Sequence, residues 1–200
     1  LSPEGHRIIL RTFRQAFPHA TLWLTRGYSI LLATPERLKV DYEQLAERLG
    51  RDEVEASLFE VDLNDPASFL SALALDEEAY ADYAGSGKVN TDDRAHVSLA
   101  DRSRAGTTAG LSALAGLVPY LVQDVDPLWS FEDESDRQDV ARRFVSRAHF
   151  FRADVALKMG DRRTAIQELR RARVVDPEES WAARMIQGLR AAESKANRSR

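Results

Sequence analysis

The sequence predicts an α/β fold for the first part of the chain and an all-α fold for the last part. Residues 2–17 have the apolar spacing of a helix, and two runs rich in β-branched and aromatic residues follow directly, at 20–24 and 28–32. From residue 135 onward, apolar residues recur at helical spacing instead. With 44% hydrophobic residues, the 200-residue chain can form a packed core.

The first expected element is a helix that begins at Pro3. Ser2 can cap this helix, and proline loses nothing at a position where the N–H has no helical partner. Pro18 ends the helix. Its expected apolar stripe consists of residues four apart: Ile9, Phe13 and Phe17.

The two runs that follow predict an antiparallel hairpin around Arg26-Gly27. Neither run alternates strictly between apolar and polar residues, and nearly continuous apolar strands need cover on both faces of their sheet. One helix and a hairpin cannot supply that cover. We therefore expect parallel strands of the same sheet to precede Leu1 in a longer polypeptide.

Three short helices are expected next, each beginning at an aspartate that can cap it: Asp41, Asp65 and Asp76. Gly50 ends the first of these helices and Gly85 ends the third. The second is expected to run through residues 69–75, while residues 54–61 and 96–99 are expected to form short strands.

Residues 105–122 carry no charge over 18 residues, about the shortest length that crosses a bilayer. Their content of small residues, together with Pro119, favours a buried helix, and a membrane span is the alternative. A polar, acidic segment at 123–135 is expected to act as a linker. The expected domains are residues 1–104, a helical connector at 105–134 and a helical tail at 135–200.

The helical tail is expected to begin at a capping box formed by Ser135 and Gln138. A turn at Gly160-Asp161 introduces a second helix, and a third follows Asp176-Pro177. The expected inward positions are Val140, Phe144, Ala148, Phe151 and Val155 in the first helix, Ala165, Ile166, Leu169 and Ala172 in the second, and Trp181, Met185 and Leu189 in the third.

This tail resembles a tetratricopeptide repeat, in which Gly-Asp separates two closely packed helices and Asp-Pro closes the unit. The matching positions are Ala153, Gly160-Asp161, Ala165, Ala172 and Asp176-Pro177. The resemblance implies a helical hairpin that binds a protein partner.

The first 104 residues resemble the C-terminal part of the spermidine synthase-like (polyamine aminopropyltransferase) family. The matching stretches are residues 17–23, the strand at 30–34, the helix after Asp41 and Asn90-Thr91-Asp92-Asp93-Arg94. The resemblance implies a Rossmann-like sheet of the class I methyltransferase type, which closes with a helix and an antiparallel hairpin. It also implies transfer of an aminopropyl group from decarboxylated S-adenosylmethionine to an amine such as putrescine.

In that family a glycine-rich turn after the first strand holds the cofactor, and the glycines of this chain do not form such a turn. We therefore expect no cofactor site and no catalytic residue here, and decarboxylated S-adenosylmethionine would be the co-substrate of the longer protein. The expected partner is the upstream part of the same polypeptide, and a homodimer is a further expectation. With no cysteine, the chain suits the cytoplasm, while the longer protein is a candidate for membrane anchoring. The alternative function is a non-enzymatic interaction module that uses the helical tail.

Two sets of residues are candidates for binding. Asp92 and Asp93 are adjacent carboxylates that can bind an amine substrate or simply form a turn. Arg163, Arg170 and Arg171 can bind an acidic protein partner or simply face solvent. No nucleic acid is expected, because no aromatic residues interleave with these arginines. No metal site is expected either, since the four histidines lack ligand spacing: His6, His19, His96 and His149.

Overall fold

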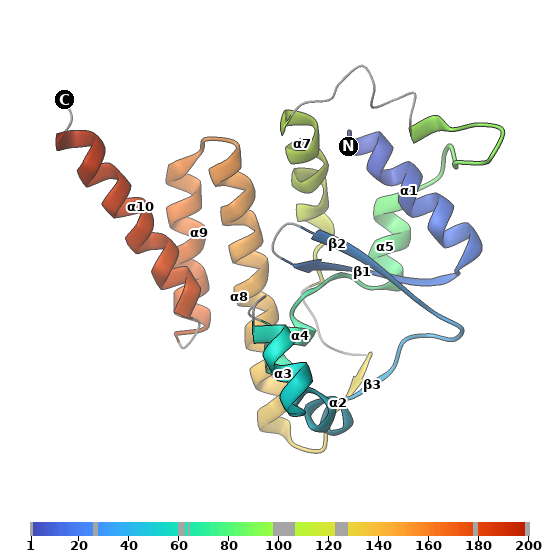
Figure 1. Cartoon of the computed structure of the whole chain (residues 1–200), viewed down its shortest axis with the longest axis horizontal. Helices are drawn as coiled ribbons and strands as arrows, with labels where there is room; N and C mark the ends of the chain where they lie inside the picture. The colour runs from blue at the N-terminus through green and yellow to red at the C-terminus, as the bar shows by residue number, and fades with distance from the viewer. Residues whose placement is uncertain are drawn as a thin grey trace. The chain divides into compact units, whose positions relative to one another are not determined.

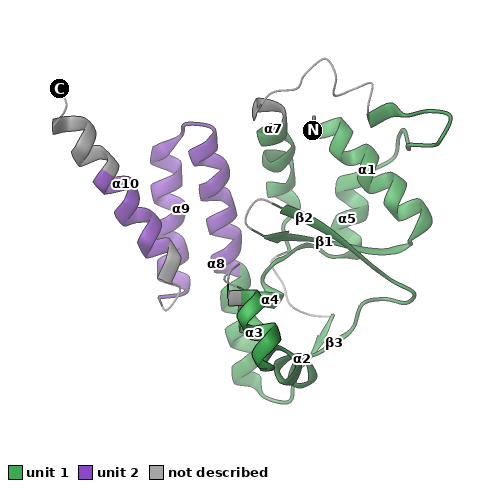
Figure 2. Cartoon of the chain, in the orientation of Figure 1, with its two compact units in different colours: residues 1–144 green, residues 145–200 purple. Residues whose placement is uncertain are grey.

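The computed structural model describes residues 2–25, 28–59, 63, 65–97, 107–122, 128–177 and 180–198. It divides into two compact units, residues 1–144 and 145–200 (Figure 2). The division falls inside a long helix. Residues 123–127, which belong to the segment predicted as a linker, lie outside the described residues.

The first unit contains both helices and short strands (Figure 1). In chain order they are α1 (Pro3–Ala16), β1 (His19–Thr25), β2 (Tyr28–Thr34), β3 (Val40–Asp41), α2 (Tyr42–Leu49), α3 (Asp52–Phe59), α4 (Pro66–Leu70), β4 (Leu73–Leu75), α5 (Glu77–Ala84), α7 (Thr107–Leu117), the 3-10 turn η1 (Val118–Tyr120) and β5 (Trp129–Ser130). Helix α8 (Glu134–Lys158) continues into the second unit, which also contains α9 (Arg162–Val175) and α10 (Ser180–Arg198). The predicted order of an α/β part before a helical part is thereby confirmed.

A three-stranded antiparallel sheet in the order β2-β1-β4 lies within the first unit. Strands β1 and β2 form the predicted hairpin, with Trp23 opposite Ile30. The predicted turn of this hairpin, Arg26-Gly27, lies outside the described residues. A separate two-stranded sheet pairs β3 with β5 in parallel.

The helix predicted through residues 69–75 is wrong in its second half. Helix α4 ends at Leu70, and Leu73–Leu75 form β4, in which all three residues are buried. A helix would turn one of three consecutive residues toward solvent, whereas a strand covered on both faces buries all three. Leu75 pairs with Leu22 of β1, so the tertiary pairing overrides the helical pattern.

The strands predicted at residues 54–61 and 96–99 are also wrong for the residues that the structure describes. Asp52–Phe59 form α3, whose first turn is acidic and therefore interacts favourably with the helix dipole. His96 and Val97 are helical. The remaining residues of both segments lie outside the described residues.

Helix α1 begins as predicted, because the Ser2 hydroxyl accepts a hydrogen bond from the Gly5 N–H at 3.0 Å. The predicted apolar stripe is not the face that this helix buries. Ile8 and Leu10 are the apolar residues that this helix buries, and the Tyr80 hydroxyl of α5 donates to the Leu10 carbonyl at 2.9 Å. The residues of the predicted stripe are half-buried or exposed: Ile9, Phe13 and Phe17.

Side-chain hydrogen bonds connect α1, α5 and α7, which lie on one side of the β1–β2 hairpin (Figure 1). The Tyr83 hydroxyl of α5 donates to the Ala113 carbonyl of α7 at 3.3 Å and lies 3.1 Å from Nδ1 of His6 in α1. The Arg11 guanidinium of α1 donates to the Ala84 carbonyl at the end of α5, at 2.7 Å. This bond satisfies a carbonyl that has no partner within its own helix.

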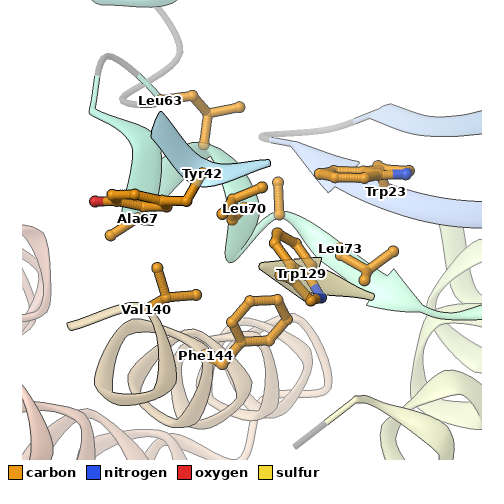
Figure 3. Packing of buried hydrophobic residues seen from close by; sticks show 10 residues of the cluster. Trp23, Tyr42, Leu63, Ala67, Leu70, Leu73, Trp129, Val140 and Phe144 are labelled. Carbon is orange, nitrogen blue, oxygen red and sulfur yellow. The ribbon is translucent and has the colours of Figure 1, made fainter. Parts of the chain in front are cut away.

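The opposite face of β1 contributes to a core of aromatic and aliphatic side chains (Figure 3). The ring centres of Trp23 in β1 and Phe69 in α4 lie 5.7 Å apart, and those of Trp129 and Phe144 lie 5.6 Å apart, edge to face. The other buried members are Tyr42, Leu63, Ala67, Leu70, Ala72, Leu73 and Val140. Because Leu22 points to the face opposite Trp23 and is also buried, β1 is covered on both faces.

Within the uncharged segment, residues 107–120 are helical, as α7 followed by η1, and residues 121–122 are not. Ala113 and Leu117 are buried, which agrees with the predicted buried helix. Across the described ranges, no helix combines the length and the apolar character that a membrane span needs.

Helix α8 begins at Glu134, two residues earlier than a capping box with Ser135 as the N-cap predicts. The Asp133 carboxylate accepts hydrogen bonds from the Ser135 N–H at 2.8 Å and from the Ser135 hydroxyl at 2.9 Å. These bonds hold the pKa of Asp133 below its usual range. Ser135 is therefore a donor to the capping group, because a carboxylate is available two residues before it.

Helices α8 and α9 form a hairpin at Gly160, whose φ of +81° suits glycine. Asp161 caps α9 by accepting a hydrogen bond from the Thr164 N–H at 3.0 Å, and Asp176 ends the helix. Small residues occupy most of the core of this unit, together with Leu169 and Ile186: Ala153, Ala156, Ala165, Ala172 and Ala182. Their size lets the helices approach closely.

Most of the predicted inward positions of the tail are buried: Val140, Phe144, Ala148, Val155, Ala165, Leu169 and Ala172. Others are only half-buried: Phe151, Ile166, Met185 and Leu189. The side chain of Trp181 lies outside the described residues.

Because several tyrosines are buried, we predict that the folded state loses stability in alkali. Burial, followed by the nearby carboxylates of Asp136 and Asp65, raises the pKa of Tyr42 to about 12, and burial also raises the pKa values of Tyr80 and Tyr83. Tyrosine hydroxyls in the unfolded chain ionise at about pH 10. The folded state therefore keeps its full stability below that pH and loses stability as the pH rises toward 12. Urea unfolding at about pH 8 and about pH 11 measures this loss, which Tyr42→Phe should reduce. An unfolding midpoint that stays constant over this range would contradict the assignment.

Close packing of the tail predicts that larger side chains destabilise it. Ala165→Leu or Ala172→Leu should lower the free energy of unfolding by about 1–3 kcal/mol, because each adds volume at a fully buried helix contact. Ala191→Leu on the exposed face of α10 is the matched control and should be nearly neutral. Chemical unfolding of the three variants tests this, and equal effects would remove the packing argument.

Candidate functional site: the outer edge of strand β2

Burial in the sheet changes abruptly between β1 and β2. The five central residues of β1, 20–24, are all buried. In β2, by contrast, the exposed fractions are 75% for Tyr28, 49% for Ile30 and 39% for Leu32. An exposed row of large apolar side chains on one strand is unusual enough to indicate a contact surface.

The three exposed side chains lie on the same face of β2, because side chains alternate along a strand. Ile30 pairs with Trp23 of β1, so this is the face on which Trp23 packs against Phe69. The cover that α4 supplies therefore reaches β1, while Ile30 and Leu32 next to it remain exposed. The apolar layer is incomplete at β2.

The outer edge of β2 presents backbone groups that β1 does not use. The Leu24 N–H of β1 donates to the Ala72 carbonyl on the side of β4, at 2.7 Å, so the neighbouring Trp23 and Thr25 face β2. The β2 residues that pair with them therefore direct their backbone N–H and C=O groups toward β1. By alternation, the N–H and C=O groups that point outward belong to Ser29, Leu31 and Ala33.

Strand β2 also lacks the features that usually protect an open edge. Its seven residues include no charged side chain and no proline, and its pairing with β1 runs without a bulge. Within the described ranges, no strand pairs with this edge. An uncharged, regular and apolar edge is suited to receiving another strand.

Asp92 and Asp93 occupy an exposed turn. Thr91 and Arg94 close this turn through two backbone hydrogen bonds, at 3.2 and 3.0 Å. The preceding segment is attached to α1, since the Asn90 N–H donates to the Thr12 hydroxyl at 2.8 Å. The turn that the sequence suggests is therefore present, and amine binding by its carboxylates stays a prediction.

An open hollow of about 490 Å³ lies between α1 and the loop that follows α5. Arg11 lines it, yet this guanidinium already donates to Glu4, at 2.8 Å, and to two carbonyls. Glu77 lines it as well and lies 3.1 Å from Nδ1 of His19 and 3.4 Å from Nε of Arg37. These charges stabilise the fold locally.

The three arginines proposed for partner binding are exposed on α9. Arg171 pairs with Glu168, a buried carboxylate whose Oε2 also lies 2.7 Å from Nδ1 of His149 in α8. Arg171 thus contributes to contacts within the helical unit. Arg163 and Arg170 lie seven residues apart on the face of α9 opposite its buried residues, so they share a surface.

Three of the described histidines contact side chains of other elements. His6, His19 and His149 each lie within hydrogen-bond distance of a side chain on another element. Burial is the main cause that lowers the pKa of His6. Within the described ranges, no group of three or more histidine, aspartate or glutamate residues has the arrangement of a metal site.

Comparisons of the chain with protein-family models, curated proteins and solved structures found no match. The function therefore has to be inferred from the chain's own sequence and geometry.

Proposed function

We propose that residues 1–104 are the closing part of the α/β sheet of a spermidine synthase-like protein and that they act as scaffold without a cofactor site of their own. The observation that carries this proposal is the sheet that remains open at β2. A strand buried on both faces next to one with an exposed apolar row is expected where a sheet continues into another part of the protein.

The order of the elements supports the same proposal. Helix α1 leads directly into the β1–β2 hairpin, which is the order with which the sheet of this Rossmann-like family closes. The turn that contains Asp92 and Asp93 has the sequence most specific to the family, and α1 holds the segment before it. An amine substrate would interact with these carboxylates only if the rest of the protein brings it there.

The longer protein would transfer an aminopropyl group from decarboxylated S-adenosylmethionine to an amine. In that reaction a neutral amine nitrogen attacks the carbon next to the sulfonium, so the site must position both reactants and remove a proton. The residues that do this would lie before Leu1. A cytoplasmic location is part of the proposal and is supported by the lack of cysteine, and membrane anchoring of the longer protein remains a proposal too.

The helical tail favours a second candidate function, which is protein binding. The hairpin turn at Gly160, the cap at Asp161 and the alanine-rich packing support a tetratricopeptide-like unit. Arg163 and Arg170 face outward and would interact with an acidic surface. That surface would belong to another protein or to a second copy of this one. In this alternative the first unit is scaffold for an adaptor without enzymatic activity.

A polypeptide limited to residues 1–200 should show neither aminopropyl transfer nor measurable affinity for an S-adenosylmethionine analogue. The physical reason is that no glycine-rich turn after a strand is present to hold the cofactor. Isothermal titration calorimetry with the analogue measures this, and binding at micromolar affinity, about −8 kcal/mol, would contradict it. The same titration on the protein with its upstream residues retained should show binding, and a failure there would favour the adaptor.

A further inference from the structure

The outward face of α9 carries positive charge that the helical unit does not use. Residues 162–175 contain five arginines and a single acidic residue, Glu168, whose buried carboxylate is already paired within the unit. Arg170 and Arg173 are exposed, and neither forms an ion pair with any residue in the described ranges. A negatively charged surface is therefore the complement of this face.

An exposed apolar side chain lies within the same face. Val174 is 81% exposed, and it adjoins Arg170 and Arg173 because residues three and four positions apart are neighbours on a helix. The surface thus presents two positive charges and one apolar group at positions i, i+3 and i+4. A helix that matches it would present two negative charges and one small apolar group at the same spacing.

Helix α3 of the first unit has this pattern with the opposite charge. Asp52, Glu55 and Ala56 are exposed and occupy positions i, i+3 and i+4, whereas Leu58 packs against the core. Residues 52–59 contain three acidic residues and no basic one. None of the three acidic side chains forms an ion pair with another residue in the part of the chain that the structure describes.

We propose that the basic face of α9 in one copy of the protein packs against α3 in a second copy. With the two helices side by side and parallel, each position meets its complement: Arg170 with Asp52, Arg173 with Glu55, and Val174 with Ala56. Guanidinium and carboxylate groups suit such a contact because they form paired hydrogen bonds. This inference rests on the second candidate function, protein binding by the helical tail, and adds the partner and the surface that it presents.

Sedimentation velocity on the chain of residues 1–200 tests the self-association. Exposed ion pairs are individually weak, so the contact should be reversible. At about 0.05 M salt the sedimentation coefficient should rise between about 1 µM and about 1 mM protein, and at about 1 M salt it should stay constant because charges are screened within about 3 Å. A chain that remains monomeric at low salt would overturn the proposal, and so would self-association that high salt leaves unchanged.

Two charge-reversed variants identify the surfaces. The double substitution Arg170→Glu and Arg173→Glu should weaken self-association at least about tenfold, and so should Asp52→Lys and Glu55→Lys. An equimolar mixture of the two variants should associate again, because each acidic helix then meets a basic one on the other copy. A mixture that stays monomeric would overturn the assignment of α9 and α3 as partners.

A matched control separates this contact from the general effect of charge. Glu78→Lys with Asp82→Lys makes the same change of charge on the exposed side of α5 and should leave self-association as it is. Circular dichroism checks that each variant stays folded. Equal weakening by this control would overturn the proposal. A monomeric chain that binds an acidic protein through Arg163 and Arg170 would overturn this inference alone and leave the proposed protein binding standing.

Discussion

The rest of the first unit depends on the burial of strand β1 between two layers. Leu22 is fully buried on one face and Trp23 packs with Phe69 on the other, so α4 and the helices around α1 are positioned by the same short strand. Each buried leucine of this kind stabilises the folded state by about 1.5–3 kcal/mol through removal from water. Strand β1 is covered on both faces, whereas the large apolar side chains of β2 are exposed. The packing of the sheet is therefore complete at β1 and incomplete at β2.

The helical unit follows a different constraint, which is close approach of helices through small residues. Alanines such as Ala165 and Ala172 leave no room for long side chains, and the buried Glu168 is tolerated because His149 and Arg171 pair with its carboxylate. Because His149 belongs to α8 and Glu168 to α9, their contact joins these two helices. Arg171 is consequently a less available binding residue than Arg163 or Arg170.

Features that depend on neighbouring residues were predictable from the sequence, whereas features that depend on distant ones were not. The caps at Ser2, Asp41, Asp65 and Asp76 are local hydrogen bonds and appear where the sequence places them. Leu73–Leu75 form a strand because they pair with β1. Helix α1 buries Ile8 in place of Ile9 because its contacts with α5 and α7 determine which of its faces is covered. The expectation of further strands in the sheet stays a prediction. The outward groups of β2 required the register of the hairpin.

The account can be tested most directly at one cross-strand pair in the chain of residues 1–200. Leu22 and Leu31 lie opposite each other, one fully buried in β1 and the other half-buried in β2. If burial is concentrated in β1, Leu22→Ala should lower the free energy of unfolding by about 2–5 kcal/mol, and Leu31→Ala by about 1 kcal/mol or less. Equal losses for the two substitutions would show that β2 is as well covered as β1, and would contradict the claim that the sheet remains open at its edge.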